Sequence, residues 1–379
     1  MIVCYTGTIC HMRILAAAVL CFTLPMLCGP VPAADAPDVF EEIAEPQAKK
    51  SVKLYRSPSE RREAGLGRKV TDWLSISGLA EVESEYEDFG FDGDKSSESD
   101  DVTTTTLQLG LNFTLSERVS AEFVGEYEVN ANHSIIDEGI LKYEGETLGI
   151  EAGRLYIPFG EFYSHFVTGP ILELGETRGN AMVAEFELSD FVDVFAYGIE
   201  SKAEKQGDSG HQIDWGGGFE FASEDESVKV SAGYFSNLAD ADEQPLEDFD
   251  NKYQRRVGGI TANALFGWET HEITAEYLGA LRSFSELDSE ENLPWAVNFE
   301  AAWFLLDNFQ LAGRVEASGE VPDEPQLQLG VSVTWLIGYR FNLSVDYLFG
   351  KFKDDFVFDD DDNEIDSRQL IAAQLSLEF

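Results

Sequence analysis

The chain has 379 residues, of which 71 are acidic and 26 are basic, so its formal net charge is −45 at pH 7. This negative excess argues against a nucleic-acid-binding protein, whose binding surface needs the opposite sign. It also requires an architecture that keeps the carboxylates hydrated or far apart, because a compact globule with this charge would repel itself.

Residues 1–36 have the features of a signal peptide. Arg13 precedes an apolar run that reaches Cys28, and small residues follow, with a cleavage site expected near Ala34 or Ala36. A membrane anchor is the alternative, but the apolar run is short and is followed by proline and polar residues. All four cysteines lie in this segment, so we expect neither disulfides nor a thiol-based site in the mature chain.

Residues 37–72 form a distinct basic segment ahead of the first predicted strand. We expect the segment to be periplasmic. It could fold back and partly plug an acidic lumen, or it could be a flexible lead-in to the barrel. Its basic residues are Lys49, Lys50, Lys53, Arg56, Arg61, Arg62, Arg68 and Lys69.

From Trp73 onward, apolar residues recur at every second position, as in Leu107, Leu109, Leu111 and Phe113. This period is typical of strands with one apolar and one polar face. The pattern predicts an all-β protein in which residues 73–379 form a transmembrane antiparallel β-barrel of about sixteen strands. The strands expected at 135–143 and 191–199 do not keep their apolar residues in one phase. The sixteen predicted spans are 73–87, 101–113, 119–130, 135–143, 148–156, 177–188, 191–199, 212–222, 228–235, 255–266, 271–281, 294–304, 309–317, 326–335, 339–349 and 367–379.

The connections alternate between short and long through most of the chain. Tight turns are expected at 114–118, 144–146, 189–190, 305–308 and 336–338, and long acidic connections at 88–100, 201–211, 236–254, 282–293, 318–325 and 350–366. An outer-membrane barrel has short periplasmic turns at one end and longer extracellular loops at the other. The alternation therefore favours a barrel in the outer membrane over a soluble β-sandwich.

The last residue, Phe379, ends a strand with no polar tail behind it. In a closed barrel the final strand can pair with the first strand up to its last residue, and Phe379 would lie in the aromatic girdle at the membrane interface. A terminal strand ending in Phe also resembles the signal that the barrel assembly machinery recognises, so this machinery is an expected partner.

The polar rows of the predicted strands are rich in glutamate, and we expect them to line a water-filled lumen. Further inward acids are expected at Glu300, Glu316 and Asp346, whereas Arg314 is one of few basic positions. Such a lining would attract cations and repel anions; hydration of the wall alone is the alternative, but the one-sided excess of acids favours cation selectivity. The main predicted lumen residues are Glu81, Glu83, Glu122, Glu126, Glu185, Glu272 and Glu276.

The acidic stretch 354–366 could bind a divalent cation such as calcium, or bridge to lipopolysaccharide through such ions. It lacks the spacing and the central glycine of a helix–loop–helix calcium site, so a solvated loop is the simpler interpretation. The histidines beyond the signal segment show no catalytic order and no metal-ligand spacing. They are His133, His165, His211 and His271. We therefore predict no enzyme activity, no cofactor and no metal centre.

One connection, at about 157–176, is long and apolar, with Phe159, Phe162 and Phe166 among its residues. Folding into the barrel would bury these residues and narrow the pore; packing over the mouth or against a neighbouring subunit is the alternative. For the constriction we predict Glu161, Glu173, Glu176 and Arg178. A carboxylate–arginine pair across the pore would create a transverse field.

Three stretches resemble the LbtU-type siderophore porins of Gram-negative bacteria: Tyr156-Ile-Pro-Phe-Gly160, Pro170-Ile-Leu-Glu-Leu-Gly-Glu-Thr-Arg178 and Ile76-Ser-Gly-Leu-Ala-Glu-Val-Glu83. The similarity is most specific over residues 73–200. It implies an outer-membrane barrel associated with the import of ferric siderophores.

The predicted function is an outer-membrane channel, with the ferric siderophore as the solute that the resemblance implies. A general diffusion porin that prefers cations is the first alternative. A structural or adhesive surface barrel that binds divalent cations is the second. Expected partners are outer-membrane lipid, lipopolysaccharide and small solutes, with an oligomer possible and no nucleic acid.

Overall fold

The computed structural model describes residues 67–91, 98–207, 212–243, 245–246, 249, 251–287, 292–338, 340–353, 357 and 364–379. The predicted signal peptide, residues 37–66 of the basic segment, His211 and most of the acidic stretch 354–366 lie outside these residues. No helix in the described part of the chain is long and apolar enough to cross a membrane.

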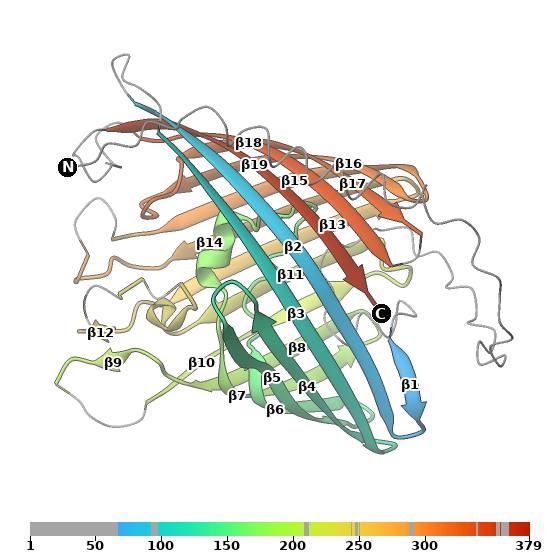
Figure 1. Ribbon diagram of the computed structural model, residues 1–379. Helices are drawn as coiled ribbons and strands as arrows, with labels where there is room; N and C mark the ends of the chain where they lie inside the picture. Colours follow the sequence, from blue (N-terminus) through green and yellow to red (C-terminus); the bar gives the residue numbers. More distant parts are fainter. Residues whose placement is uncertain are drawn as a thin grey trace, which may run out of the picture. The chain divides into compact units, whose positions relative to one another are not determined.

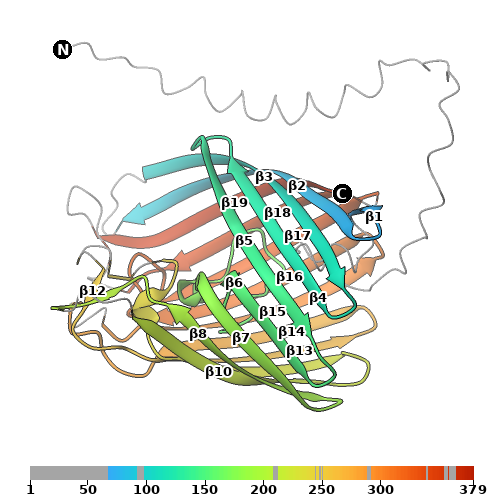
Figure 2. The same ribbon diagram turned by 90° about the horizontal axis from the view of Figure 1, so that it is seen from below.

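The described residues form a closed, antiparallel, sixteen-stranded β-barrel (Figures 1 and 2). The predicted fold class and strand count are confirmed, and each of the sixteen predicted spans overlaps one barrel strand. The barrel strands are β2 (Leu74–Phe91), β3 (Glu98–Ser116), β4 (Val119–Glu128), β5 (His133–Glu144), β6 (Leu148–Tyr156), β7 (Arg178–Ser189), β8 (Val192–Glu200), β10 (Ile213–Ala222), β11 (Val228–Phe235), β13 (Gly259–Trp268), β14 (His271–Ala280), β15 (Trp295–Leu306), β16 (Phe309–Gly319), β17 (Leu327–Ile337), β18 (Phe341–Lys351) and β19 (Ile365–Glu378).

Each barrel strand pairs with its neighbours in sequence, and β19 pairs with β2 to close the ring. Two smaller pairings lie outside the ring. The short strand β1 (Arg68–Thr71) pairs with the start of β2, and β9 (Glu204–Lys205) pairs in parallel with β12 (Lys252–Tyr253). Closure gives every central strand two partners, which satisfies its backbone polar groups within the bilayer.

The two faces of the wall differ in the way that the alternation predicts. On β15, the outward Trp295, Phe299 and Trp303 are exposed, whereas the inward Asn298 and Glu300 are buried. The same exposed apolar row continues around the wall, for example on β17 and β18. An outward apolar face of this kind meets the hydrocarbon of the membrane.

A β-bulge explains why the sequence of β5 loses its phase. Val124 pairs with Glu138, but the next residue, Gly125, pairs with Ile136. Asp137 is therefore the extra residue, and both Asp137 and Glu138 line the interior. A bulge of this kind re-aims side chains beside a functional site.

Strand β8 departs from the pattern for a different reason. Its inward residues Tyr197 and Ile199 are buried in an apolar cluster inside the barrel, with Phe195 packed against that cluster. Apolar residues therefore face inward on this strand because loops fill the interior beside it.

The two ends of the barrel also differ, as the connections predict. Short turns follow β3, β5, β7, β10, β13, β15 and β17; we call this the turn end. The longer connections, including 157–177, 201–212 and 236–258, leave from the opposite loop end. In outer-membrane barrels the turn end faces the periplasm.

Candidate functional site

The connection between β6 and β7, residues 157–177, does not extend beyond the barrel. We call it the inner loop. It begins and ends on one side of the barrel, where Ile157 N–H donates to Thr177 O at 3.0 Å. Its short 3₁₀ helix η2 (Ile171–Gly175) contacts β14 and β15 across the interior, and it is the green coil beside the β14 label in Figure 1.

Buried carboxylates of the far wall hold the first half of the inner loop. Glu276 on β14 accepts the backbone N–H groups of Glu161, at 2.8 Å, and Phe162, at 3.0 Å. Glu300 on β15 accepts the N–H of His165 at 2.7 Å and the hydroxyl of Ser164 at 2.9 Å. Backbone amides thus stabilise two carboxylates that would otherwise be buried at high cost.

The second half of the inner loop is held in the same way. Asp346 on β18 accepts the N–H of Val167 at 2.6 Å, and Glu316 on β16 accepts the N–H of Ile171 at 2.9 Å. Carboxylates from four different strands therefore bind successive amides along the inner loop. Because the strands are rigid, these bonds fix the path of the loop through the barrel.

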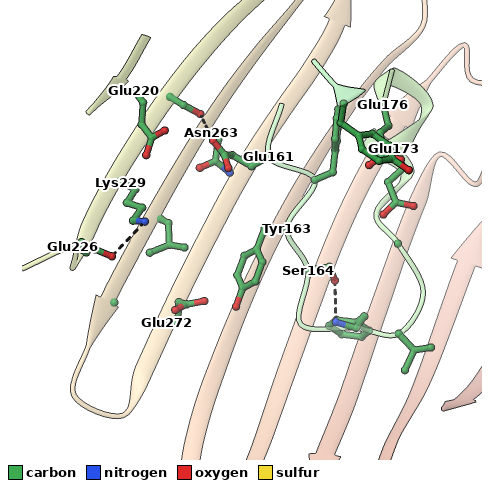
Figure 3. A pocket seen from close by; sticks show the side chains of 18 of the residues that line it. Glu161, Tyr163, Ser164, Glu173, Glu176, Glu220, Glu226, Lys229, Asn263 and Glu272 are labelled. Carbon is green, nitrogen blue, oxygen red and sulfur yellow. Dashed lines mark hydrogen bonds and ion pairs between the residues drawn. The ribbon is translucent and has the colours of Figure 1, made fainter. Parts of the chain in front are cut away.

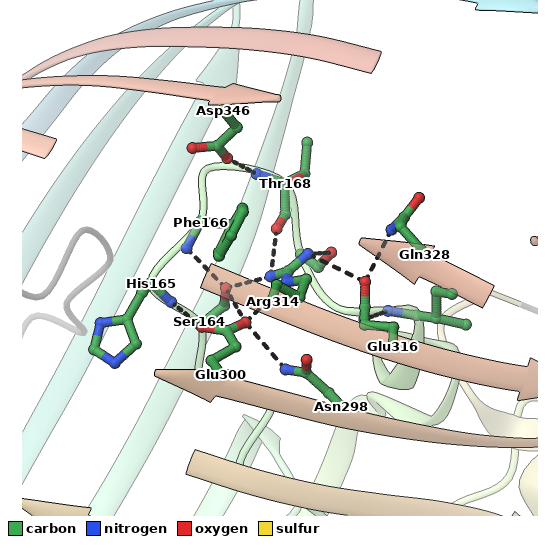
Figure 4. Close-up of polar contacts among 12 residues, drawn as sticks. Ser164, His165, Phe166, Thr168, Asn298, Glu300, Arg314, Glu316, Gln328 and Asp346 are labelled. Atoms are coloured by element: carbon green, nitrogen blue, oxygen red, sulfur yellow. Dashed lines mark hydrogen bonds and ion pairs between the residues drawn. The ribbon is translucent and has the colours of Figure 1, made fainter. Parts of the chain in front are cut away.

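Arg314 on β16 is the positive centre of this arrangement (Figure 4). Its guanidinium lies 2.9 Å from Glu300 and 3.4 Å from Glu316. It also donates to the carbonyl oxygens of Thr168 and Gly169, both at 3.0 Å. The side chain is fully buried, so solvent screens these ion pairs only weakly.

The ring of Phe166 covers the same guanidinium, with 4.3 Å between Arg314 Cζ and the ring centroid. Such a cation–π contact is stronger when both groups are removed from water. Elsewhere Phe159 and Leu172 of the inner loop are fully buried in the apolar cluster with Leu278 and Phe235. The apolar residues that marked this connection in the sequence are therefore packed inside the barrel.

A cavity of about 1680 Å³ lies between the inner loop and the barrel wall and extends to the turn end. Among the residues that line it, carboxylates greatly outnumber the two basic residues, Arg178 and Lys229. Figure 3 shows part of this lining. Its acidic members are Glu81, Glu83, Glu126, Asp137, Glu138, Glu161, Glu173, Glu176, Glu220, Glu224, Asp225, Glu226, Asp242, Glu269 and Glu272.

A second recess of about 560 Å³ adjoins this cavity along β5 to β8, β10 and β11. Glu161, Glu220 and Ser231 line both, so we treat the two as parts of one lumen. Glu161 Oε1 accepts the hydroxyl of Ser231 at 3.2 Å, which bridges the inner loop to β11.

The structure distributes the predicted lumen residues over three environments. Glu122 is buried and pairs with Lys142 at 3.0 Å, and Glu276 holds the inner loop. The remaining residues line the lumen. The main cavity is lined by Glu81, Glu83, Glu126 and Glu272, and the second recess by Glu185.

All four residues proposed for the constriction line the main cavity: Glu161, Glu173, Glu176 and Arg178. Arg178 contacts the wall beside it rather than a residue across the pore, pairing with Asp137 and donating to Tyr156 Oη at 3.0 Å. The expected carboxylate–arginine pair spanning the lumen is thus replaced by a contact along one side of the wall, from β7 across β6 to β5. The bulge that turns Asp137 inward creates it.

Two carboxyl groups of the inner loop have shifted proton affinities. Burial, helped by the nearby charge of Glu176, raises the pKa of Glu173 to about 8. Burial, helped by the charge of Asp242, raises the pKa of Glu176 to about 7. Both groups therefore exchange protons near neutral pH.

The role of Glu300, Arg314, Glu316 and Asp346 as anchors was not predicted. The alternation predicts that these side chains point inward, but the role predicted for them was cation selectivity of the lumen. One signal was available: Glu300 and Arg314 are direct cross-strand partners in the β15–β16 register.

His165 lies among the anchors of the inner loop. Its Nε2 lies 3.1 Å from Glu272 Oε1, and Gln310 Nε2 lies 3.1 Å from its Nδ1. Within the described ranges, no group of three or more histidine, cysteine or acidic side chains could hold a metal ion.

No known protein-family profile matches the chain. A UPF0422 protein of Coxiella burnetii is 31% identical over 140 residues, which are 35% of this chain and 30% of that protein. A UPF0422 protein of Legionella pneumophila is 22% identical over 253 residues, 58% of this chain and 46% of that protein. The chain thus spans less than half the length of these curated relatives.

Solved structures with a similar fold are outer-membrane porins. The outer-membrane channel DcaP of Acinetobacter baumannii has a TM-score of 0.58 at 15% identity, covering 82% of this chain and all of that chain. An anion-selective porin of Comamonas acidovorans has a TM-score of 0.58 at 12% identity, covering 81% and 99%. Salmonella typhi OmpF, in complex with daunomycin, has a TM-score of 0.54 at 14% identity, covering 81% and 97%.

Proposed function

We propose that the protein is a passive outer-membrane channel that prefers cations, narrowed by the inner loop. The premise is the porin-like channel fold in the outer membrane. The fold alone does not set the sign of the permeating ion, since an anion-selective porin has the same fold. Selectivity must therefore come from the side chains along the lumen.

The observation that carries the proposal is the one-sided charge of the main cavity lining. Two of its carboxylates are held in place by amides: Gln108 donates to Glu126 at 2.8 Å, and Gln374 donates to Glu83 at 3.2 Å. Fixed carboxylates in a narrow, low-dielectric passage concentrate cations and repel anions.

The anchoring carboxylates contribute less to selectivity in this proposal. The charges of Glu300 and Glu316 are opposed by Arg314 and by backbone amides. The path for ions is then the main cavity, which lies between the inner loop and the wall of β2 to β6 and of β10 to β14. Here Glu81, Glu83 and Glu126 face the cavity.

Planar-bilayer recording in a KCl gradient tests the proposal. We expect a reversal potential displaced toward the equilibrium potential of K⁺. The double variant Glu83→Gln/Glu126→Gln should reduce this displacement. Glu117→Gln, in the turn after β3 and outside the cavity lining, is the matched control and should leave it unchanged. A wild-type reversal potential at zero, or displaced toward that of Cl⁻, would contradict cation preference.

Ferric-siderophore uptake, which the sequence resemblance implies, is compatible with this lumen for one class of chelate only. A carboxylate lining repels anionic ferric complexes, so neutral or positively charged ferric chelates are the expected cargo. Uptake into proteoliposomes of two ferric chelates of similar size and opposite charge would test this. Faster entry of the anionic complex would count against it.

The planar-bilayer recording also distinguishes the channel from the alternative, a structural or adhesive barrel. A protein that inserts into the bilayer without any conductance would support a structural role and overturn the channel.

A further inference from the structure

The inner loop presents two aromatic rings to the cavity, and one sits on a strained backbone. Phe162 has a φ of 47°, a left-handed conformation that is unfavourable for a bulky residue. Glu276 holds it there by accepting the Phe162 N–H at 3.0 Å. One side of the ring packs over Gly160, which itself has a φ of 90°, and the ring also lines the cavity.

Tyr163 is the second ring. The Tyr163 and His165 rings form a T-shaped contact with 5.0 Å between their centroids. Tyr163 projects from the inner loop toward the side of the cavity where Glu272 lies (Figure 3). Phe162 and Tyr163 are only half-buried, whereas Phe159 and Phe166 of the same loop are almost completely buried. Leaving apolar surface toward a water-filled lumen is unfavourable, and a solute with an apolar body would cover it.

The groups around these rings are mostly acidic. Glu161 adjoins Phe162 in the chain and is exposed, with Ser231 positioning its carboxylate. Glu220 on β10 and Glu272 on β14 line the same space. Lys229 on β11 also lines this space; it lies 3.6 Å from Glu226, which offsets its charge.

Leu265 on β13 adds an apolar side chain to the wall of the same cavity. The space is thus lined by aromatic rings on the loop and by carboxylates and an aliphatic side chain on the wall. An aromatic face attracts a cation, and a nearby carboxylate strengthens the attraction. A small inorganic cation would use the carboxylates but would leave the rings exposed to water.

We infer that this part of the lumen binds organic cations with an aromatic or apolar body, between the Glu161–Tyr163 edge of the inner loop and the wall of β10 to β14. The inference rests on the proposed cation-preferring channel and names the class of solute that it selects. The ammonium group would lie near Glu161, Glu220 and Glu272, and the apolar body against Phe162 and Tyr163.

The test is inhibition of the K⁺ current through the full-length channel in planar bilayers. Benzyltrimethylammonium and tetraethylammonium are cations of equal charge and similar size, and only the first has an aromatic ring. We expect benzyltrimethylammonium to halve the current at a concentration about fivefold lower than tetraethylammonium. Both cations can make a cation–π contact, and only the benzyl ring adds stacking on Phe162 and Tyr163. Neutral benzyl alcohol should leave the current unchanged.

Variants of Phe162 and Tyr163 test whether these rings cause the difference in potency between the two cations. Tyr163→Leu keeps an apolar side chain and should bring the two cations close to equal potency, and Phe162→Gly should do the same while relieving the left-handed backbone. Tyr163→Phe should retain the wild-type difference. The KCl reversal potential of each variant shows that the channel is formed and still selective.

The outcomes separate the two proposals. Preference for K⁺ with equal inhibition by both ammonium ions in the wild type would overturn this inference and leave the proposed function standing. A difference that survives both ring variants would also overturn it. Absence of K⁺ preference in the wild type would overturn the proposed function.

Discussion

The ring of Phe379 lies over the backbone of Gly78, and the two residues exchange both backbone hydrogen bonds. Gly78 N–H donates to Phe379 O at 2.9 Å, and Phe379 N–H donates to Gly78 O at 3.1 Å. A β-carbon at Gly78 would clash with the ring. The last residue of the chain thereby extends the β19–β2 seam that closes the barrel.

This seam predicts that Gly78→Val and Phe379→Ala both impair closure. The valine must displace the terminal ring, and the alanine removes it. For Phe379→Ala we expect a loss of about 1–2 kcal/mol in the free energy of unfolding, because the ring is only partly buried. Urea titration of the detergent-refolded barrel, followed by gel mobility, measures the loss. Phe379→Tyr should behave like the wild type; equal stability of all three variants would contradict the role of this contact.

Removing Arg314 should have a larger effect. In Arg314→Ala, Glu300 and Glu316 stay buried without their counterion, which costs about 3–5 kcal/mol. Freed from these bonds, the inner loop should widen the pore, so single-channel conductance should rise. Urea titration and bilayer recording check the two effects.

Arg314→Lys is an informative companion, since it keeps the charge but cannot bind Glu300, Thr168 O and Gly169 O in one fork. We expect an intermediate conductance. Arg118→Ala is the control: its pair with Glu146 is exposed at 3.6 Å and should matter little. Wild-type conductance in Arg314→Ala would show that the loop does not depend on this residue.

Ion selectivity should depend on pH near neutrality. Because the pKa is raised to about 8 at Glu173 and about 7 at Glu176, both groups are mostly protonated at pH 6 and ionised at pH 9. Preference for K⁺ over Cl⁻ should therefore increase with pH across this range. Reversal potentials at pH 6, 7.5 and 9 measure it. In Glu173→Gln/Glu176→Gln the change should be smaller, and an identical change in both proteins would exclude these two groups as its source.

The same groups affect stability in the opposite sense. A carboxyl group whose folded pKa lies above its unfolded value binds protons more tightly when folded, so its contribution is complete below about pH 4.5 and is lost as pH rises through 7 to 8. We expect the double glutamine variant to lose less stability than the wild type between pH 6 and 9 in urea titrations. A parallel loss in both proteins would contradict the assignment.

The connections at the loop end contain a separate testable contact. Asp240 is buried, and its Oδ1 accepts the Ser201 hydroxyl and the N–H groups of Lys202 and Ala203 at 2.8–3.0 Å. Burial, with the adjacent carboxyl of Asp214, raises the pKa of Asp240 to about 8. The Asp240 carboxyl is therefore expected to be mostly protonated at neutral pH.

Asp240→Asn should be tolerated within about 1 kcal/mol, because its oxygen keeps the three bonds and its neutral amide replaces the protonated carboxyl group. Asp240→Ala leaves buried donors without an acceptor and should lose at least about 2 kcal/mol. Limited proteolysis of the 201–212 and 236–258 connections, alongside urea titration, distinguishes the variants. Equal protease resistance of the alanine and asparagine variants would contradict this account.

The sequence predicted the strands of this barrel closely because the bilayer imposes one strong rule on them. Residues such as Phe299 and Trp303 must alternate with Asn298 and Glu300 when one face meets hydrocarbon and the other does not. The alternation is lost at two strands. On β8 the inward Tyr197 packs against loops inside the barrel, and on β5 a bulge adds Asp137.

The candidate site was predicted less completely. The apolar connection at 157–177 indicated a loop within the barrel, and its carboxylates were placed along the lumen. What the sequence left open was the partner of each charge. Arg178 could be expected to face a carboxylate across the pore. Instead it pairs with Asp137, which a β-bulge on β5 turns inward, and the alternation of the sequence does not reveal that bulge.

By itself, then, the sequence determined the strands, the direction in which most side chains point and the outer-membrane barrel, since these follow from a local period of two residues and from connections that alternate in length. Only the tertiary structure decided which acids hold the inner loop and which face the solute. That division depends on which acids lie opposite the inner loop once the sheet has closed. Residues as distant in sequence as Val167 and Asp346 come into contact only then.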